Sequence, residues 1–336
     1  MAVKISIVES YKHYGKCLKI TNDLLEILIT VDVGPRIIYF AAPGGENLLF
    51  NDESKSLGTS GELFESVFGV GERFFFYGGH RMWLAPQLMI HTSVPDNDPV
   101  KYTLIENGVK LTPEPQEILG VQPYMKVTMP PDEARISIEV RYTNISEEEK
   151  QHACWQITQM APGGVAFVPF MPELKMRNPG KPGARMPDFD LLKPLVPRGV
   201  LAMFIGGFDD PRFGIDSRYI TLKHDPSIYR PIKFGNANKE GWAMYANKGQ
   251  MITLEFEHNP DGQYTDGGSS FECFASQDFL ELESLGELIT MKPGDTITHT
   301  ETLSLGPMLA DLPDLNDRLA VAEFVDLHRV HNSIEK

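Results

Sequence analysis

The sequence predicts an all-β protein made of antiparallel strands with a short C-terminal helix. Segments that alternate apolar and polar residues follow one another along the chain, and the clearest is 134–142. Turn residues recur roughly every ten positions, which is the rhythm of an antiparallel sandwich or barrel. Helical spacing of apolar residues is convincing near the C-terminus, after Pro313 and Asp314.

The strands are expected where β-branched or aromatic runs lie between turn residues. Gly34-Pro35 separates the first two of these runs, and Asn107-Gly108 is a strong hairpin signal inside the third. The turn 292–295 should make a hairpin of the FLELESLG segment and 296–302. In chain order we expect strands at 25–32, 36–41, 101–111, 134–142, 154–159, 165–170, 200–206, 218–223, 242–246, 251–258, 279–286 and 296–302.

Length and composition indicate an ordinary globular protein of 336 residues with a net charge of −15. No linker or internal repeat divides it, so we expect a single domain over 1–336. The negative charge argues against nucleic acid or an anionic membrane as a partner. The first residues lack the apolar run of a signal peptide, and no stretch is long enough for a membrane helix. These observations predict a cytoplasmic protein.

Cysteine and histidine spacing argues against a metal site. The three cysteines, Cys17, Cys154 and Cys273, show no CxxC spacing and are expected to be reduced structural residues. The nine histidines form no HxH or HExxH motif, and no GxSxG, P-loop or GxGxxG run is present. We expect neither a metal nor a cofactor.

Two carboxylates in one segment are the first candidate for chemistry. Glu281 and Glu283 stand two residues apart in FLELESLG. Side chains alternate between the two faces of a strand, so both carboxylates should share one face, with Leu280 and Leu282 packing behind them. Like charge and burial drive such pKa values apart, as a general acid or base requires. Glu272, in SSFECF, is a further candidate.

The run YGGHRMW at 77–83 is the second candidate. Two glycines allow close approach of the backbone to a ligand. His80 and Arg81 could then bind sugar hydroxyls, while Trp83 stacks on the C–H face of a pyranose. The alternative is that Trp83 is a core residue and that His80 and Arg81 belong to a surface turn.

Three weaker candidates remain. Lys233 and the nearby Trp242 could bind an oxyanion or hydroxyl, although a solvated turn explains them equally well. Asp266 in a glycine turn is most often a plain turn residue, with ligand contact as the alternative. The proline- and glycine-rich span 172–197 is long and irregular, which is typical of a functional loop or of a surface excursion.

Several of these motifs together carry a resemblance that covers nearly the whole chain. They resemble a bacterial family of uncharacterised proteins that is similar to the galactose mutarotase-like (aldose 1-epimerase-like) superfamily. The segment VDVGPRIIYF looks like that superfamily's early strand, and YTNISEEEKQHACWQIT resembles its central Thr-Asn segment. The motifs concerned are YGGHRMWLAPQ, KFGNANKEGWAMY and DGGSSFECFASQDFLELESLGELITMKPGDTITHTET.

The resemblance implies a galactose mutarotase-like antiparallel β-supersandwich with a carbohydrate cleft on its concave sheet. In such enzymes a late Glu takes the anomeric hydroxyl proton and a His protonates the ring oxygen, which is acid–base work without a cofactor. By position the Glu corresponds to Glu281 or Glu283. The Gly-Gly-His-Arg run points to His80 and Arg81.

The sequence departs from those enzymes at the general acid. Where they have a His-x-Tyr-Phe-Asn segment, this chain has His152-Ala153-Cys154-Trp155-Gln156, and a shift of one residue would turn His152 to the other face. We therefore expect a carbohydrate-binding protein that acts as an aldose 1-epimerase-like isomerase, with His80 or His152 as the acid.

Two alternatives to the isomerase remain open. The first is a sugar-binding or sensing protein without catalysis. The second is a carbohydrate lyase or glycosidase, for which Tyr77 or Tyr264 could serve as the acid. In each case the expected partner is a small-molecule carbohydrate, and the oligomeric state is left open.

Overall fold

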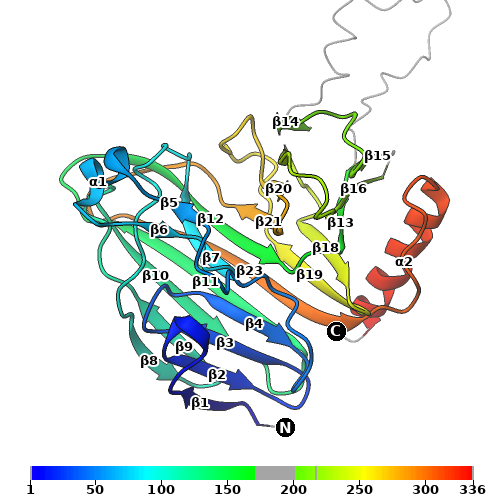
Figure 1. The fold of residues 1–336 in the computed structure, drawn as a ribbon, viewed down its shortest axis with the longest axis horizontal. Coiled ribbons are helices and arrows are strands. Elements are labelled where there is room, and N and C mark those ends of the chain that lie inside the picture. The colour runs from blue at the N-terminus through cyan, green and yellow to red at the C-terminus, as the bar shows by residue number, and fades with distance from the viewer. Residues whose placement is uncertain (1, 171–200, 216–217, 335–336) are drawn as a thin grey trace, which may run out of the picture.

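Two large antiparallel sheets pack face to face in the computed structural model of the protein (Figure 1). The structure describes residues 2–170, 201–215 and 218–334. Within these residues one sheet has 11 strands and the other 10. A two-stranded ribbon, β5 (Gly58–Thr59) with β6 (Phe74–Phe75), and a short helix, α1 (Glu62–Phe68), lie beside the first sheet. The predicted antiparallel all-β architecture is confirmed.

Each sheet draws its strands from distant parts of the chain. The first sheet runs in the order β1 (Lys4–Val8), β2 (Cys17–Thr21), β3 (Glu26–Thr30), β4 (Ile37–Ala41), β7 (His80–Ala85), β12 (Lys150–Met160), β21 (Leu280–Leu285), β20 (Phe271–Ala275), β17 (Ile232–Asn236) and β14 (Ala202–Ile205), with β22 (Ile289–Met291) paired to β12. The second runs in the order β15 (Phe213–Ile215), β16 (Tyr219–Lys223), β13 (Val165–Pro169), β18 (Trp242–Asn247), β19 (Gln250–Phe256), β23 (Thr296–Pro307), β11 (Arg135–Asn144), β10 (Val121–Thr128), β9 (Gly108–Thr112) and β8 (Lys101–Ile105).

Every segment predicted as a strand overlaps a strand of the structure. Other strands, among them β2, β7, β10, β17 and β20, were not predicted. The hairpin expected around Asn107 is formed by β8 and β9, and Asn107 takes the positive φ of 55° that its tight turn requires. α1 and the ribbon β5–β6 were not predicted, because their short segments carry little periodicity.

The hairpin predicted between the FLELESLG segment and 296–302 is wrong. β21 lies in the first sheet between β12 and β20, whereas β23 lies in the second sheet between β19 and β11. The turn itself is present, since the backbone N–H of Asp295 donates to the carbonyl of Lys292. It connects β22 to β23, because a turn signal marks a reversal of the chain without selecting the sheet that the next strand joins.

The main core lies between the two sheets. Alternate residues of β21, Leu280 and Leu282, are fully buried there against inward side chains of the second sheet such as Ile138 and Leu303. The free cysteines Cys17, Cys154 and Cys273 are also buried.

The predicted C-terminal helix is α2 (Arg318–Ile334), and it covers the outer face of the second sheet. Its Phe324 and Val325 pack against Phe167 and Met244. The side chain of Asp317 accepts hydrogen bonds from the backbone N–H groups of the first turn and so caps the helix. No helix among the described residues has the length and apolarity to cross a membrane.

Replacement of Leu282 by Ala should destabilise the protein by about 2–5 kcal/mol, because it leaves a cavity between the sheets. The matched control is Leu319→Ala on α2, where the side chain is 75% exposed and the expected change is within about 0.5 kcal/mol. Denaturant unfolding of both variants measures the difference. Equal stability of the two variants would mean that this strand does not face a packed core.

Candidate functional site

The register of the first sheet gathers three glutamates on the face that points away from the second sheet. Glu281 and Glu283 share this face, as predicted, because Leu280 and Leu282, which alternate with them, enter the core. β20 places Glu272 directly opposite Glu283. We call this surface the carboxylate face. Across β21 it continues onto β12, where Gln159 pairs with Glu281, and onto β7, where Arg81 pairs with Ile157.

Lys233 holds two of these glutamates together. Its Nζ lies 2.7 Å from Oε2 of Glu272 and 3.0 Å from Oε2 of Glu283, and it also lies 4.7 Å from the ring centre of Trp155. Burial alone would lower the pKa of Lys233, but the charges of Glu283 and Glu272 outweigh burial and raise it. Lys233 is therefore a fixed positive charge between two buried carboxyl groups, which need such a partner.

Glu281 has a different environment. Gln159 donates a hydrogen bond of 2.8 Å to its Oε1, and Nη2 of Arg81 lies 3.9 Å from the same atom. Burial and the neighbouring Glu283 raise the pKa of Glu281 to about 7, against the opposing charges of Arg81 and Lys233. Glu281 is 8% exposed whereas Glu283 is 0% exposed, so Glu281 is the more accessible carboxylate of the pair.

Glu272 is a second carboxyl group that titrates near neutral pH. Burial raises its pKa to about 8, and the charge of Glu283 adds to the shift while Lys233 opposes it. The carboxylate face thus holds one carboxyl poised to lose its proton near pH 7 and another that keeps its proton slightly longer. In the described part of the chain, no group of three or more His, Cys, Asp or Glu side chains is arranged to hold a metal ion.

Several buried polar atoms of this face have no hydrogen-bond partner in the described part of the chain. Such atoms are rare in folded proteins. Those on this face include both donors and acceptors, which suits a ligand rich in hydroxyl groups. They are Nε and Nη1 of Arg81, Nε1 of Trp155, Oε1 of Gln159, Oε1 of Glu272 and Oε1 of Glu283.

Aromatic rings form a row beside the charges. Trp83 lies between Trp155 and Phe74, with ring centres 5.6 and 5.7 Å away and nearly parallel planes. The guanidinium carbon of Arg81 sits 4.1 Å from the Trp83 ring centre. Trp83 is therefore on the predicted face, but its own neighbours occupy the ring, which makes it a support for Arg81 rather than a free stacking surface. The half-buried Phe76 also lies near Arg81, 5.5 Å from its guanidinium carbon.

His80 does not face the glutamates. It pairs with Thr158, one residue out of phase with Arg81, and so points between the sheets. Nδ1 of His80 lies 3.0 Å from Oγ1 of Thr158 and 3.2 Å from Oε1 of Glu301 on β23. Burial lowers the pKa of His80 to about 3. The expectation that His80 stands opposite the carboxylates as the acid is corrected by this geometry.

The glycines before His80 serve the fold. A Cβ on Gly78 would lie 2.2 Å from the carbonyl oxygen of Phe50, and one on Gly79 would lie 2.2 Å from that of Ile37. Both glycines also have positive φ, of 102° and 72°. The close backbone approach predicted for this pair is therefore an approach to neighbouring segments rather than to a ligand.

Two other predicted binding residues lie away from the carboxylate face. His152 stands seven positions before Gln159 on β12, which is about 23 Å along a strand. There it forms a hydrogen bond with the backbone of Ala85 and pairs with Ile289 of β22. Trp242 lies on the second sheet, where its ring packs near Tyr219 and under α2. The sequence could not show this, because it does not reveal which strands share a sheet.

The last two predictions concern Asp266 and the irregular span 172–197. Asp266 sits in the turn before β20, and its charge contributes to the raised pKa of Glu272, which places it near the site. Oδ2 of Asp266 is buried without a hydrogen-bond partner in the described residues, so its contact with a ligand stays a prediction. The span 172–197, predicted to be a functional loop or surface excursion, lies outside the described residues.

Sequence reasoning missed Gln159 and Trp155. Both lie on β12, which pairs with β7 on one side and β21 on the other and so occupies the centre of the site. Their strand was predicted, but its neighbours were not. A buried glutamine within an apolar strand was the one available signal.

Known structures identify the fold. No family model matches the sequence, and neither does any curated protein. The chain is similar to a galactose mutarotase-like protein from Lactobacillus casei ATCC 334, with 12% identity and a TM-score of 0.52 over 86% of this chain and 100% of that one. It is also similar to a TPR-domain containing protein from Parabacteroides distasonis ATCC 8503, with 12% identity and a TM-score of 0.55 over 90% of this chain and 50% of that one.

These similarities confirm the predicted fold class. The chain has the galactose mutarotase-like antiparallel β-supersandwich, and it spans half the length of the Parabacteroides protein. At 12% identity, the likeness concerns the fold alone.

Glu301, which is buried between the sheets beside His80, predicts that the stability of the protein depends on pH. Ser284 donates a 2.6 Å hydrogen bond to Oε2 of Glu301, and burial raises the pKa of Glu301 to about 8. An unfolded glutamate has a pKa of about 4.3. The contribution of Glu301 to the free energy of unfolding is therefore complete below that pH, and it is lost as the pH rises through about 8.

The variant Glu301→Gln should remove this dependence. Between pH 5.5 and 8.5 we expect the free energy of unfolding of the parent protein to fall by on the order of 1–3 kcal/mol more than that of the variant. Urea unfolding at the two pH values measures this, with the exposed Glu117→Gln as a control that should follow the parent. Parallel pH curves for parent and Glu301→Gln would contradict the assignment.

Proposed function

We propose that this protein binds a carbohydrate on the carboxylate face and interconverts its anomers by acid–base catalysis, with Glu281 as the base. The observation that carries the proposal is the position of Glu281. Its carboxyl group, with a pKa raised to about 7, lies at the accessible end of the glutamate group and is oriented by Gln159. A group of this kind is half ionised near neutral pH, which is where a general base works best.

The acid in this proposal is Glu272. It lies on the same face, its raised pKa of about 8 keeps it protonated at pH 7, and its Oε1 is free of hydrogen bonds within the described residues. No histidine in that part of the chain forms a hydrogen bond or ion pair with Glu272, Glu281 or Glu283. In this proposal a carboxylic acid takes the place that the resemblance assigned to a histidine.

The reaction divides between the two carboxyl groups. Glu281 accepts the proton of the anomeric hydroxyl, and the C1–O bond to the ring oxygen breaks as that oxygen takes the proton of Glu272. The open-chain aldehyde turns about its C1–C2 bond, and the ring recloses with the two proton transfers reversed. Lys233 stays charged throughout and prevents Glu283 from becoming a second unpaired negative charge beside Glu281.

Arg81 and the aromatic side chains would hold the sugar. The unpartnered Nε and Nη1 of Arg81 can donate to ring hydroxyls. The half-buried rings of Phe76 and Phe274 flank the site, since Phe274 pairs with Glu281 and Phe76 lies beside Arg81. Such rings can cover the C–H face of a pyranose.

A second candidate function is sugar binding without turnover. The observation that favours it is the inward orientation of His80, which removes the expected histidine acid from the carboxylate face. In that case the carboxyl groups and Arg81 would serve as hydrogen-bonding groups only. The two functions differ in whether the bound sugar reaches its anomeric equilibrium faster than in buffer.

The variant Glu281→Gln should lower the rate of anomer interconversion by about 10²–10⁴-fold, the usual contribution of a general base. Binding of the sugar should change little, because glutamine keeps the hydrogen-bonding shape. Saturation-transfer NMR on a panel of aldoses measures the rate, and calorimetry measures the affinity. Binding without any acceleration by the parent protein would refute the isomerase and leave the binding protein.

The rate should also depend on pH in a bell shape. It rises as Glu281 ionises through about pH 7 and falls as Glu272 loses its proton through about pH 8. These apparent values belong to the interacting group of carboxyls rather than to single residues. The variant Glu272→Gln should lose the descending limb, and an unchanged profile would exclude Glu272 as the acid.

A further inference from the structure

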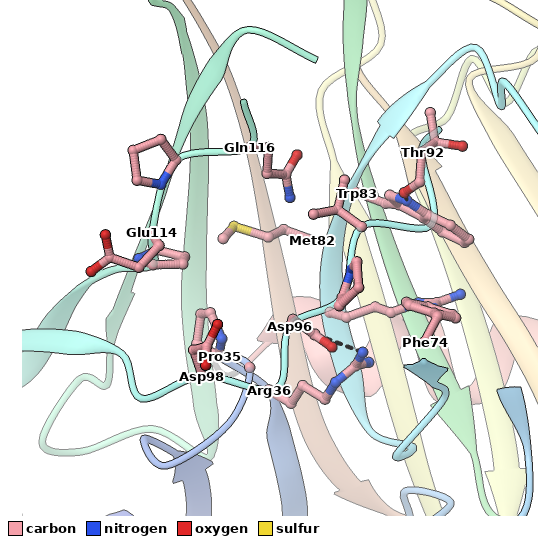
Figure 2. A pocket seen from close by; sticks show the side chains of 16 residues that line it. Pro35, Arg36, Phe74, Met82, Trp83, Thr92, Asp96, Asp98, Glu114 and Gln116 are labelled. Carbon is pink, nitrogen blue, oxygen red and sulfur yellow. Dashed lines mark hydrogen bonds and ion pairs between the residues drawn. The ribbon is translucent and has the colours of Figure 1, made fainter. Parts of the chain in front are cut away.

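A cavity of about 130 Å³ lies where β4 and β7 separate (Figure 2). The register pairs these two strands at a single position, Ile37 with His80. The gap between them is closed by two segments from elsewhere in the chain, 92–98 and 113–116. The cavity is therefore part of the fold rather than a surface irregularity.

One wall of the cavity carries an ion pair with unpartnered atoms on both sides. Nη2 of Arg36 lies 2.7 Å from Oδ2 of Asp96 (Figure 2) and 3.3 Å from the carbonyl oxygen of Phe75. Arg36 is fully buried, yet its Nε and Nη1, and Oδ1 of Asp96, have no hydrogen-bond partner in the described residues. A buried charged group left without a partner is costly, so this pair needs an occupant that both accepts and donates hydrogen bonds.

The charges of the lining balance one another. Arg36 and Arg81 are positive, and Asp96 and Asp98 are negative. The remaining carboxylate, Glu114, has a lysine partner at 2.7 Å. A ligand with a net charge of either sign would upset this balance, whereas a zwitterion keeps it. The anionic group of a zwitterion can accept from Arg36 while its cationic group donates to Asp96, and hydrogen bonds between charged groups are the strong ones.

The size of the cavity limits the ligand to a very small molecule. An engineered protein cavity of about 150 Å³ holds benzene, and this cavity is slightly smaller. Glycine has one non-hydrogen atom fewer than benzene, and alanine has the same number. Other parts of the lining are apolar, among them Pro35, Met82 and Val94, which suits a methyl group. A branched or aromatic side chain would exceed the remaining space.

We propose that this cavity binds a small zwitterionic α-amino acid, of the size of glycine or alanine, with its carboxylate on Arg36 and its ammonium group on Asp96. In an α-amino acid both charged groups are attached to the same carbon, so they can meet both members of an ion pair at once. Arg81 lines the cavity and also reaches to 3.9 Å from Glu281. The proposed contacts are nevertheless made by Arg36 and Asp96, which lie outside the carboxylate face, so the inference does not depend on the sugar reaction.

Titration calorimetry of the full chain with glycine and L-alanine tests this site. We expect both to bind in the millimolar range or tighter. Acetate and methylamine each carry one of the two charged groups. Both should bind at least tenfold more weakly than glycine, because each leaves one side of the ion pair without a partner. Ethylene glycol, which is of similar size but uncharged, should not bind measurably, and neither should L-leucine, which is too large.

Two variants locate the site. Asp96→Asn removes the charge that holds the ammonium group and should weaken glycine binding at least tenfold. Gln116 is half-buried and lies across the cavity from the ion pair (Figure 2), so Gln116→Trp should fill the cavity and abolish binding while the ion pair stays intact. Glu117 is exposed and outside the lining, and the control Glu117→Ala should bind glycine as the parent does. Urea unfolding shows whether each variant is folded, and if Asp96→Asn is not, Gln116→Trp decides.

Several outcomes would overturn the proposal. If neither glycine nor alanine binds, the cavity holds water alone. If acetate, methylamine or ethylene glycol binds as tightly as glycine, the site does not recognise a zwitterion. If leucine binds as tightly, or if Gln116→Trp keeps the glycine affinity of the parent, the amino acid binds outside this cavity. None of these outcomes bears on the proposed function, because no sugar enters the measurement.

Discussion

The ammonium group of Lys233, held between Glu272 and Glu283, is the interaction on which the candidate site depends. Carboxyl groups buried on two adjacent strands need such a cation, because the desolvation of each ionised group costs several kcal/mol. Lys233 reaches them from β17, the neighbour of β20. With one cation shared between two carboxyls, the third carboxyl, Glu281, is left with Arg81 at 3.9 Å and a pKa near 7. The raised pKa of Glu281 therefore results from its burial and from how the other charges are paired.

The two faces of the first sheet separate two polar groups with different roles. The carboxylate face carries Glu272, Glu281, Glu283, Lys233 and Arg81. The inward face of the same strands carries His80, Thr158 and Ser284, which meet His299 and Glu301 of the second sheet. Ser284 lies between Glu283 and Leu285, so the inward group anchors the strand that bears the proposed base. The first group lies on the outer face, where the ligand is proposed to bind, and the second joins the two sheets.

Alternation along single strands could be predicted from the sequence, and it was sufficient for the fold class and for the shared face of Glu281 and Glu283. Pairing between strands that lie far apart in the sequence could not be predicted. Neither the salt bridges of Lys233 nor the hydrogen bond from Gln159 follows from local pattern, because each joins residues more than 38 positions apart. Side chains alternate along a strand, so His80 points inward only because β7 begins where it does after Gly78 and Gly79. A shift of one residue would turn His80 to the other face. Trp242 illustrates the same limit, since this candidate aromatic residue lies on the other sheet.

The central claim is that burial and Glu283 give Glu281 a pKa near neutrality. Carbon-13 NMR of glutamate side-chain carboxyls, recorded across pH 4–9 for the parent protein and for Glu281→Gln, tests it most directly. A carboxyl resonance that titrates near pH 7 in the parent and is absent in the variant is the predicted result. If the resonance lost in the variant titrates near the ordinary glutamate value of about 4.3, Glu281 is an unperturbed carboxylate and the account is contradicted.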